Sequence, residues 1–118
     1  MKNFKRFFCL AALIATASTQ AIAVNVWVTD RPVRGVQSHP DGSVSFQVPG
    51  GAAPGCTENG SYFIAKSGQN SMNSDGVKMT AAMVLSAFAT QKTITFAYDN
   101  NISAQLPLCY VSSVFVNP

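Results

Sequence analysis

Few side chains in this 118-residue sequence could carry out acid–base or nucleophilic chemistry. His39 is the only histidine, and the Pro-Asp-Gly that follows it is typical of a solvated turn. A catalytic base or a zinc ion would need partners that one histidine does not supply. No spacing pairs two of the acidic residues, which are Asp30, Asp41, Glu58, Asp75 and Asp99. We therefore expect no enzyme activity, no metal and no cofactor.

Side chains suited to binding a sugar are more plentiful. The chain is rich in Asn, Gln, Ser and Thr, whose amides and hydroxyls can bond sugar hydroxyls. It also carries amphipathic rings, which can lie against the C–H face of a sugar: Trp27, Tyr62, Tyr98 and Tyr110. The alternative is that these residues only keep a domain with 11% charged residues soluble, and composition alone favours this alternative.

The first 23 residues have the three parts of a secretory signal peptide. Basic residues stand at positions 2, 5 and 6, residues 7–15 are apolar, and Ala21-Ile22-Ala23 is an A-x-A cleavage site. The apolar run is shorter than the roughly 20 residues that a membrane span needs. We predict a secreted or periplasmic protein with a single domain over residues 24–118; the alternative is an uncleaved anchor.

Basic and acidic residues balance once this segment is set aside. Eight Lys and Arg residues, less the three at positions 2, 5 and 6, leave five against five Asp and Glu. The remaining basic residues are Arg31, Arg34, Lys66, Lys78 and Lys92. Nucleic-acid binding needs a basic face on the folded domain, so nucleic acid is not indicated as a partner.

The cysteines predict one disulfide bond. Cys9 falls in the signal segment, which leaves Cys56 and Cys109 as an even pair in an oxidising compartment. The bond would close a loop of more than fifty residues and stabilise the fold by about 4 kcal/mol in the chain-entropy model. The alternative, a reactive or metal-binding thiol pair, lacks both a C-x-x-C spacing and a supporting histidine.

Alternation of apolar and polar residues predicts five strands. The first covers residues 24–37 with an interruption at "DRP" (30–32), and a Pro-Asp-Gly turn joins it to the second. The other four strands cover residues 43–48, 61–66, 93–98 and 109–116.

A helix is predicted between the third and fourth strands. Apolar residues recur at steps of four, three and four: Val77, Ala81, Val84 and Phe88. Ser74 or Asp75 can cap its first turn. The polar stretch "SGQNSMNSDG" (67–76) before it is then a connector. This order predicts a mainly β, five-stranded OB-fold-like Greek-key barrel with one α-helix. An open α+β sheet with the same elements is the alternative.

The predicted architecture resembles the secreted B subunits of bacterial AB toxins, in particular those of subtilase cytotoxin and typhoid toxin. "DRPVRGV" (30–36) is similar to the opening of their first strand. "MVLSAFATQKTITFAYD" (83–99) is similar to their helix end, turn and fourth strand, and "LCYVSSVFV" (108–116) to their final strand. The extra cysteines of those subunits have no counterpart here.

The resemblance implies a ring of five copies that binds cell-surface glycans and accompanies a catalytic A subunit. It also implies that Asp30 and Tyr98 hold the sugar. The family's serine that grips the sugar's carboxylate falls at Arg34, whose guanidinium can pair with a carboxylate. The alternative is a small secreted or periplasmic protein-interaction or structural domain that does not bind sugar.

Overall fold

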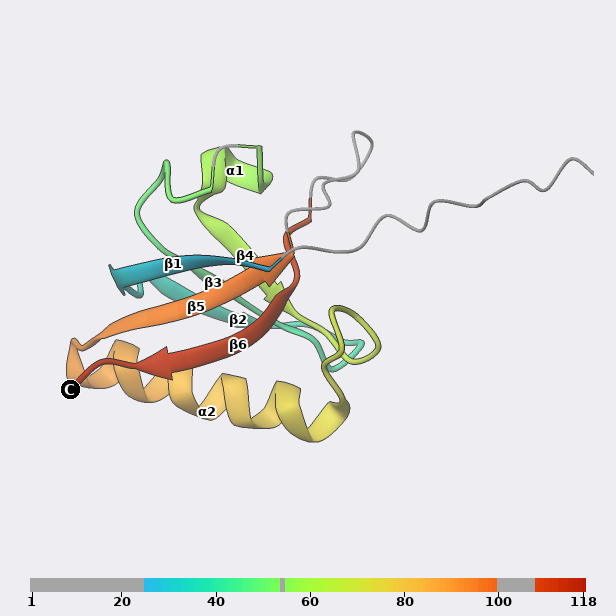
Figure 1. Cartoon of the computed structure of the whole chain (residues 1–118). Coiled ribbons are helices and arrows are strands. Elements are labelled where there is room, and N and C mark those ends of the chain that lie inside the picture. The colour runs from blue at the N-terminus through green and yellow to red at the C-terminus, as the bar shows by residue number, and fades with distance from the viewer. Residues whose placement is uncertain (1–24, 54, 100–107) are drawn as a thin grey trace, which may run out of the picture.

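Six strands and two helices make up the part of the chain that the computed structural model describes, residues 25–53, 55–99 and 108–118 (Figure 1). The predicted signal peptide (1–23) lies outside these residues. The strands are β1 (Asn25–Pro32), β2 (Gly35–Ser38), β3 (Val44–Gln47), β4 (Tyr62–Ala65), β5 (Thr93–Asp99) and β6 (Val111–Val116). The helices are α1 (Thr57–Gly60) and α2 (Ser74–Thr90).

The strands form two three-stranded antiparallel sheets that do not close into a barrel. Sheet A has the strand order β1-β5-β6, and sheet B has the order β2-β3-β4. The predicted mainly β class is confirmed, and α2 follows β4, but the predicted five-stranded OB-fold-like Greek-key barrel is wrong.

The barrel prediction failed because the expected first strand is two strands. Pro32 has no N–H and restricts the residue before it, and β1 ends there. β1 pairs with β5, whereas β2 pairs with β3 in the other sheet. The register of β1 also shifts between Val28 and Arg31, where Asp30 adopts a φ of 57°. Aspartate is among the residues that tolerate this left-handed conformation.

Three phenylalanine rings lie at the centre of the core. Phe46 and Phe63 face each other across β3 and β4 in sheet B, and Phe96 reaches them from β5 in sheet A. The ring centroids of Phe63 and Phe96 are 4.5 Å apart, and those of Phe46 and Phe96 are 5.2 Å apart. These edge-on contacts are favourable aromatic geometries, so the cluster joins the two sheets.

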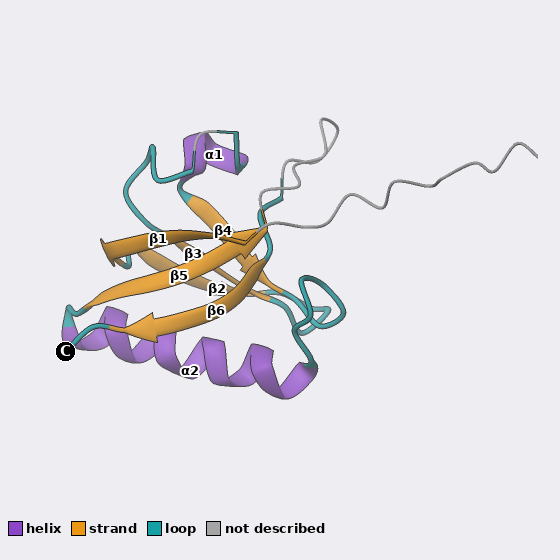
Figure 2. Cartoon of the chain, viewed as in Figure 1, coloured by secondary structure: helices purple, strands orange, loops and turns teal. Residues whose placement is uncertain are grey.

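Helix α2 runs along the sheets and packs mainly against β6 (Figure 2). Its buried residues recur every three or four positions: Val77, Thr80, Val84 and Ala87. The predicted stripe is therefore right for Val77 and Val84 but wrong for Phe88, which is exposed at the end of the helix. No helix in the described ranges is long and apolar enough to cross a bilayer.

The polar loop before α2 connects β4 to the helix, as predicted, and two of its asparagines make hydrogen bonds that hold it. The helix cap is Asn73 rather than the predicted Ser74 or Asp75, and its Oδ1 accepts a hydrogen bond from the Gly76 N–H at 2.8 Å. Asn70 adopts a positive φ, and its Nδ2 donates to the carbonyl oxygen of Tyr110 at 2.9 Å. The loop thereby fixes the segment that enters β6.

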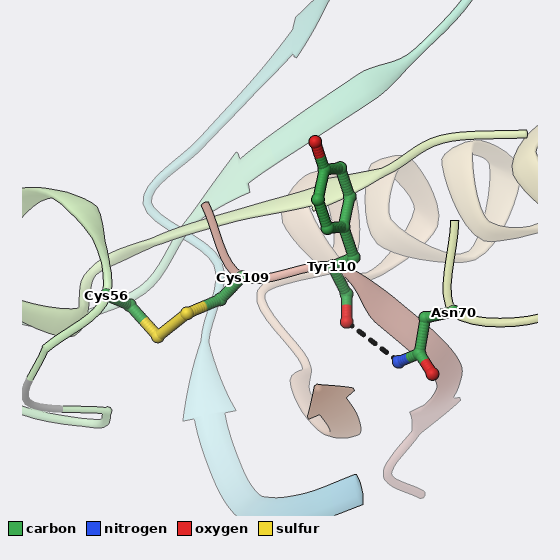
Figure 3. The surroundings of a disulfide bond; sticks show 4 residues. All are labelled: Cys56, Asn70, Cys109 and Tyr110. Atoms are coloured by element: carbon green, nitrogen blue, oxygen red, sulfur yellow. Dashed lines mark hydrogen bonds between the residues drawn. A yellow bond between two sulfur atoms is a disulfide. The ribbon is translucent and has the colours of Figure 1, made fainter. Parts of the chain in front are cut away.

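The predicted disulfide between Cys56 and Cys109 is confirmed (Figure 3). It links the start of α1 to the segment before β6, where the Ile64 N–H of β4 donates to the Cys109 carbonyl at 3.1 Å. An isolated parallel bridge pairs Ile64 with Tyr110 at the same place. Both cysteines are buried, and such a bond is typical of proteins from an oxidising compartment.

Removing this bond should destabilise the fold without changing it. A Cys56→Ser, Cys109→Ser double variant removes the link between two residues that are 53 positions apart. We expect it to lose about 4 kcal/mol of unfolding free energy. Urea unfolding followed by circular dichroism measures this loss, with reduced wild-type protein as the control. An unfolding midpoint equal to that of the oxidised protein would show that the bond does not stabilise the fold.

Candidate functional site

The three residues predicted to bind a glycan lie in different surroundings. Tyr98 is only 8% exposed, and its ring packs 5.5 Å from that of Phe63, so it belongs to the core. Arg34 is exposed in the connection between β1 and β2, where its N–H donates to the Gln47 carbonyl at 2.7 Å. Asp30 is exposed at the irregularity of β1.

Asp30 belongs to a polar network on the outer face of sheet A. Its Oδ1 accepts from the Thr93 hydroxyl at 2.6 Å, and its N–H donates to Thr95 Oγ1 at 3.3 Å. Asn117 bonds both threonine hydroxyls, at 2.8 and 3.2 Å. Sugar binding at Asp30 and Arg34 stays a prediction, and Tyr98 does not share their surface.

A different set of polar side chains gathers on the outer face of sheet B. Side chains alternate across a strand, and Phe46 and Phe63 point into the core, so their neighbours point outward. Gln37, Ser45 and Ile64 form one cross-strand row, and Gln47 faces Tyr62 in the next. This outward set contains both the hydrogen-bonding groups and the aromatic surface that a ligand site needs.

His39 lies at the centre of this face. Its Nε2 is 2.9 Å from Ser45 Oγ and 3.2 Å from the hydroxyl of Tyr62. The position follows from a tight turn, in which the His39 N–H donates to the Ser43 carbonyl and Gly42 adopts a φ of 84°. Glycine suits such a conformation because it has no Cβ. The turn thus returns the imidazole over β3.

This arrangement suits binding better than nucleophilic attack. The distance between His39 and Ser45 falls in the range of a base and its nucleophile. However, Ser45 is only 1% exposed, and the same ring nitrogen also contacts Tyr62. Among the described residues no hydrogen bond orients the other nitrogen of the ring, which a triad would require.

Asp41 and Lys66 form a charged pair beside His39. The Asp41 carboxylate accepts from the Ser43 hydroxyl at 2.6 Å and from the Ser43 N–H at 3.0 Å. Lys66 Nζ lies 3.4 Å from its other oxygen. The Ser43 bonds, with a smaller effect of Lys66, lower the pKa of Asp41 to about 2. Asp41 therefore stays ionised, and the pair carries no net charge at neutral pH.

Two hollows flank the cluster of His39, Ser45 and Tyr62. The smaller, of about 160 Å³, is lined by Gln37, Gln47 and Tyr62 among others. The larger, of about 400 Å³, extends from His39 and the Asp41–Lys66 pair to Tyr110. The larger volume falls in the range of small-ligand pockets, about 300–1,000 Å³.

Tyr110 forms one side of the larger hollow because the chain around it is fixed. Figure 3 shows its ring leaving the backbone one residue after the disulfide, while Asn70 holds its carbonyl oxygen. The bridge to Ile64 adds a third attachment. These attachments fix the backbone at Tyr110 and therefore the point from which its ring reaches the hollow.

Sequence reasoning missed most of this site, although part of the signal was present. The turn after His39 could be deduced from Pro-Asp-Gly, and the outward phase of Ser45 from its alternation with Val44 and Phe46. The contact with Tyr62 depends on the pairing of β3 with β4, which no local pattern specifies.

Comparison with known proteins does not assign the chain to a family. No protein-family model, curated protein or solved structure matches it.

The lowered pKa of Asp41 predicts a pH-dependent contribution to stability. A carboxyl whose pKa is about 2 when folded, and near 3.9 when unfolded, stabilises the fold above about pH 4. This contribution is lost as the pH falls from about 4 through 2. Urea unfolding of wild type and Asp41→Asn should therefore differ at pH 6 and converge at pH 2.

Asp75→Asn is the matched control. Asp75 is strongly exposed, 3.9 Å from Lys78, and such surface pairs contribute little. A gap between wild type and Asp41→Asn that is the same at pH 2 and pH 6 would contradict the assignment.

Proposed function

We propose that the chain is a secreted, non-catalytic binding module that recognises carbohydrate through the outer face of sheet B. The observation that carries this proposal is the cluster of His39, Ser45 and Tyr62 between two hollows. The imidazole of His39 and the phenol of Tyr62 both donate and accept hydrogen bonds, as sugar hydroxyls do, while the buried Ser45 hydroxyl holds the imidazole in place.

The surroundings of the cluster support a sugar as the ligand. Tyr62 and Tyr110 are partly exposed and line the two hollows, where their rings can pack against the C–H face of a sugar. Asp41 stays ionised and can accept bonds from hydroxyl groups, while Lys66 balances its charge. A face of this kind favours a neutral saccharide, held by hydrogen bonds and ring contact.

Assembly into several copies belongs to the same proposal. The resemblance to toxin B subunits implies a ring of five with a catalytic A subunit, and shallow sugar sites gain avidity when they are repeated. Large apolar side chains that remain exposed in the single chain support association: Trp27, Met79, Leu85, Phe88 and Phe115.

A protein-interaction domain without sugar binding is the second candidate. The observation that favours it is the outer face of sheet A, where Trp27 is 57% and Phe115 is 54% exposed. Trp27 pairs with Ala97, and Phe115 with Thr95, so both rings project from the same side of the sheet. Exposed aromatic residues of this kind are enriched where proteins meet.

Variants of Tyr62 separate the two candidates on a glycan array. We expect wild-type protein to retain a specific glycan, and Tyr62→Ala to bind it about tenfold or more weakly because a ring contact and a hydrogen bond are lost. Trp27→Ala, on the other sheet, is the matched control and should bind like wild type. Binding that survives Tyr62→Ala but is lost in Trp27→Ala would refute the proposed site.

Light scattering coupled to size exclusion tests the assembly. At micromolar concentration we expect a mass of several chains, and substitution of an exposed apolar residue, Leu85→Lys, should lower it, since a buried unpaired charge opposes association. Lys78→Gln on the same helix is the control. A monomer for the wild-type protein would remove assembly from the proposal and leave the sugar site standing.

A further inference from the structure

A third hollow lies where the β1–β2 connection meets the end of α2. It has a volume of about 340 Å³. Pro32, Val33 and Arg34 form one side, and the other is formed by Ala87, Phe88, Gln91 and Lys92. Its lining contains two cationic side chains and an exposed aromatic ring but no acidic residue.

Neither cation forms an ion pair with another residue in the part of the chain that is described. The ion pairs there are those of Lys66 with Asp41 and of Lys78 with Asp75. The carboxylate of Asp30, in β1, instead accepts a hydrogen bond from the hydroxyl of Thr93. Arg34 and Lys92 therefore line the hollow without an ion-pair partner among the described residues.

The end of α2 explains Lys92 only in part. A lysine near a helix C-terminus is favoured by the helix dipole. Here, however, the Lys92 N–H and the N–H of Gln91 both donate to the Ala87 carbonyl, so the helix end is already capped by the backbone. The dipole gives no reason for Arg34, which comes from a different element.

We propose that this hollow binds an anionic group, such as a carboxylate or sulfate, carried on a flat apolar ring. Arg34 and Lys92 pair with the anion from the two sides, since guanidinium and ammonium groups form charge-assisted hydrogen bonds with such oxygens. Phe88 and Val33 contact the ring. The site does not depend on the carbohydrate face, because it shares no lining residue with the two hollows there.

Chemical-shift titration of the purified ¹⁵N-labelled protein tests this proposal. The probes are benzenesulfonate, inorganic sulfate and, as the uncharged analogue, benzyl alcohol. We expect benzenesulfonate to shift the amides of Arg34, Phe88, Gln91 and Lys92, and to bind more tightly than sulfate. Benzyl alcohol should cause little change, and binding should weaken as salt is raised because exposed charges are screened.

Substitutions assign the roles. Arg34→Gln and Lys92→Gln should each weaken binding of benzenesulfonate about fivefold, as expected for exposed charge pairs. Phe88→Ala should weaken the binding of benzenesulfonate but not that of sulfate. Lys78→Gln, on the same helix, should change the affinity for neither. Lys92→Gln alters an exposed side chain after the helix, so it remains informative if Arg34→Gln perturbs the fold. Wild-type affinity in both charge variants, or shifts confined to other surfaces, would overturn the proposal.

Discussion

The contact between Phe96 of sheet A and the Phe46–Phe63 pair of sheet B is the interaction on which the rest of the structure depends. It joins two sheets that are each too small to bury a core alone. It also fixes the register of β3 and β4, because a shift of one residue would turn these rings toward solvent. With the register fixed, Ser45, Gln47 and Tyr62 must face outward, and the candidate site follows from the core.

The second constraint acts at Cys109. The disulfide to Cys56, the backbone bond from Ile64 and the amide of Asn70 all act on two consecutive residues, Cys109 and Tyr110. They connect the edge of sheet B to the strand that completes sheet A. The same attachments place the Tyr110 ring at the larger hollow, so one feature serves both the stability of the fold and the shape of the site.

Short-range patterns in the sequence predicted those features of the fold that depend on residue type and spacing alone. The disulfide pair, the mainly β class and the position of α2 follow from cysteine count and hydrophobic period. The split of the first strand does not, because Pro32 interrupts the pattern without showing that β1 and β2 join different sheets. Tyr98 has a hydroxyl that could bind a sugar. It lies two residues after Phe96 on the same face of β5, however, so its ring packs in the core. His39 has the sequence of a solvated turn, and only the pairing of β3 with β4 brings Tyr62 to its ring.

The central claim is that the face centred on His39, Ser45 and Tyr62 binds the ligand. Chemical-shift mapping with the glycan that the protein retains best tests it most directly. The account predicts that the amides of Gln37, His39, Ser45 and Tyr62 shift together and saturate with one affinity. Shifts confined to Trp27, Thr95 and Phe115 on sheet A, with none on sheet B, would contradict it.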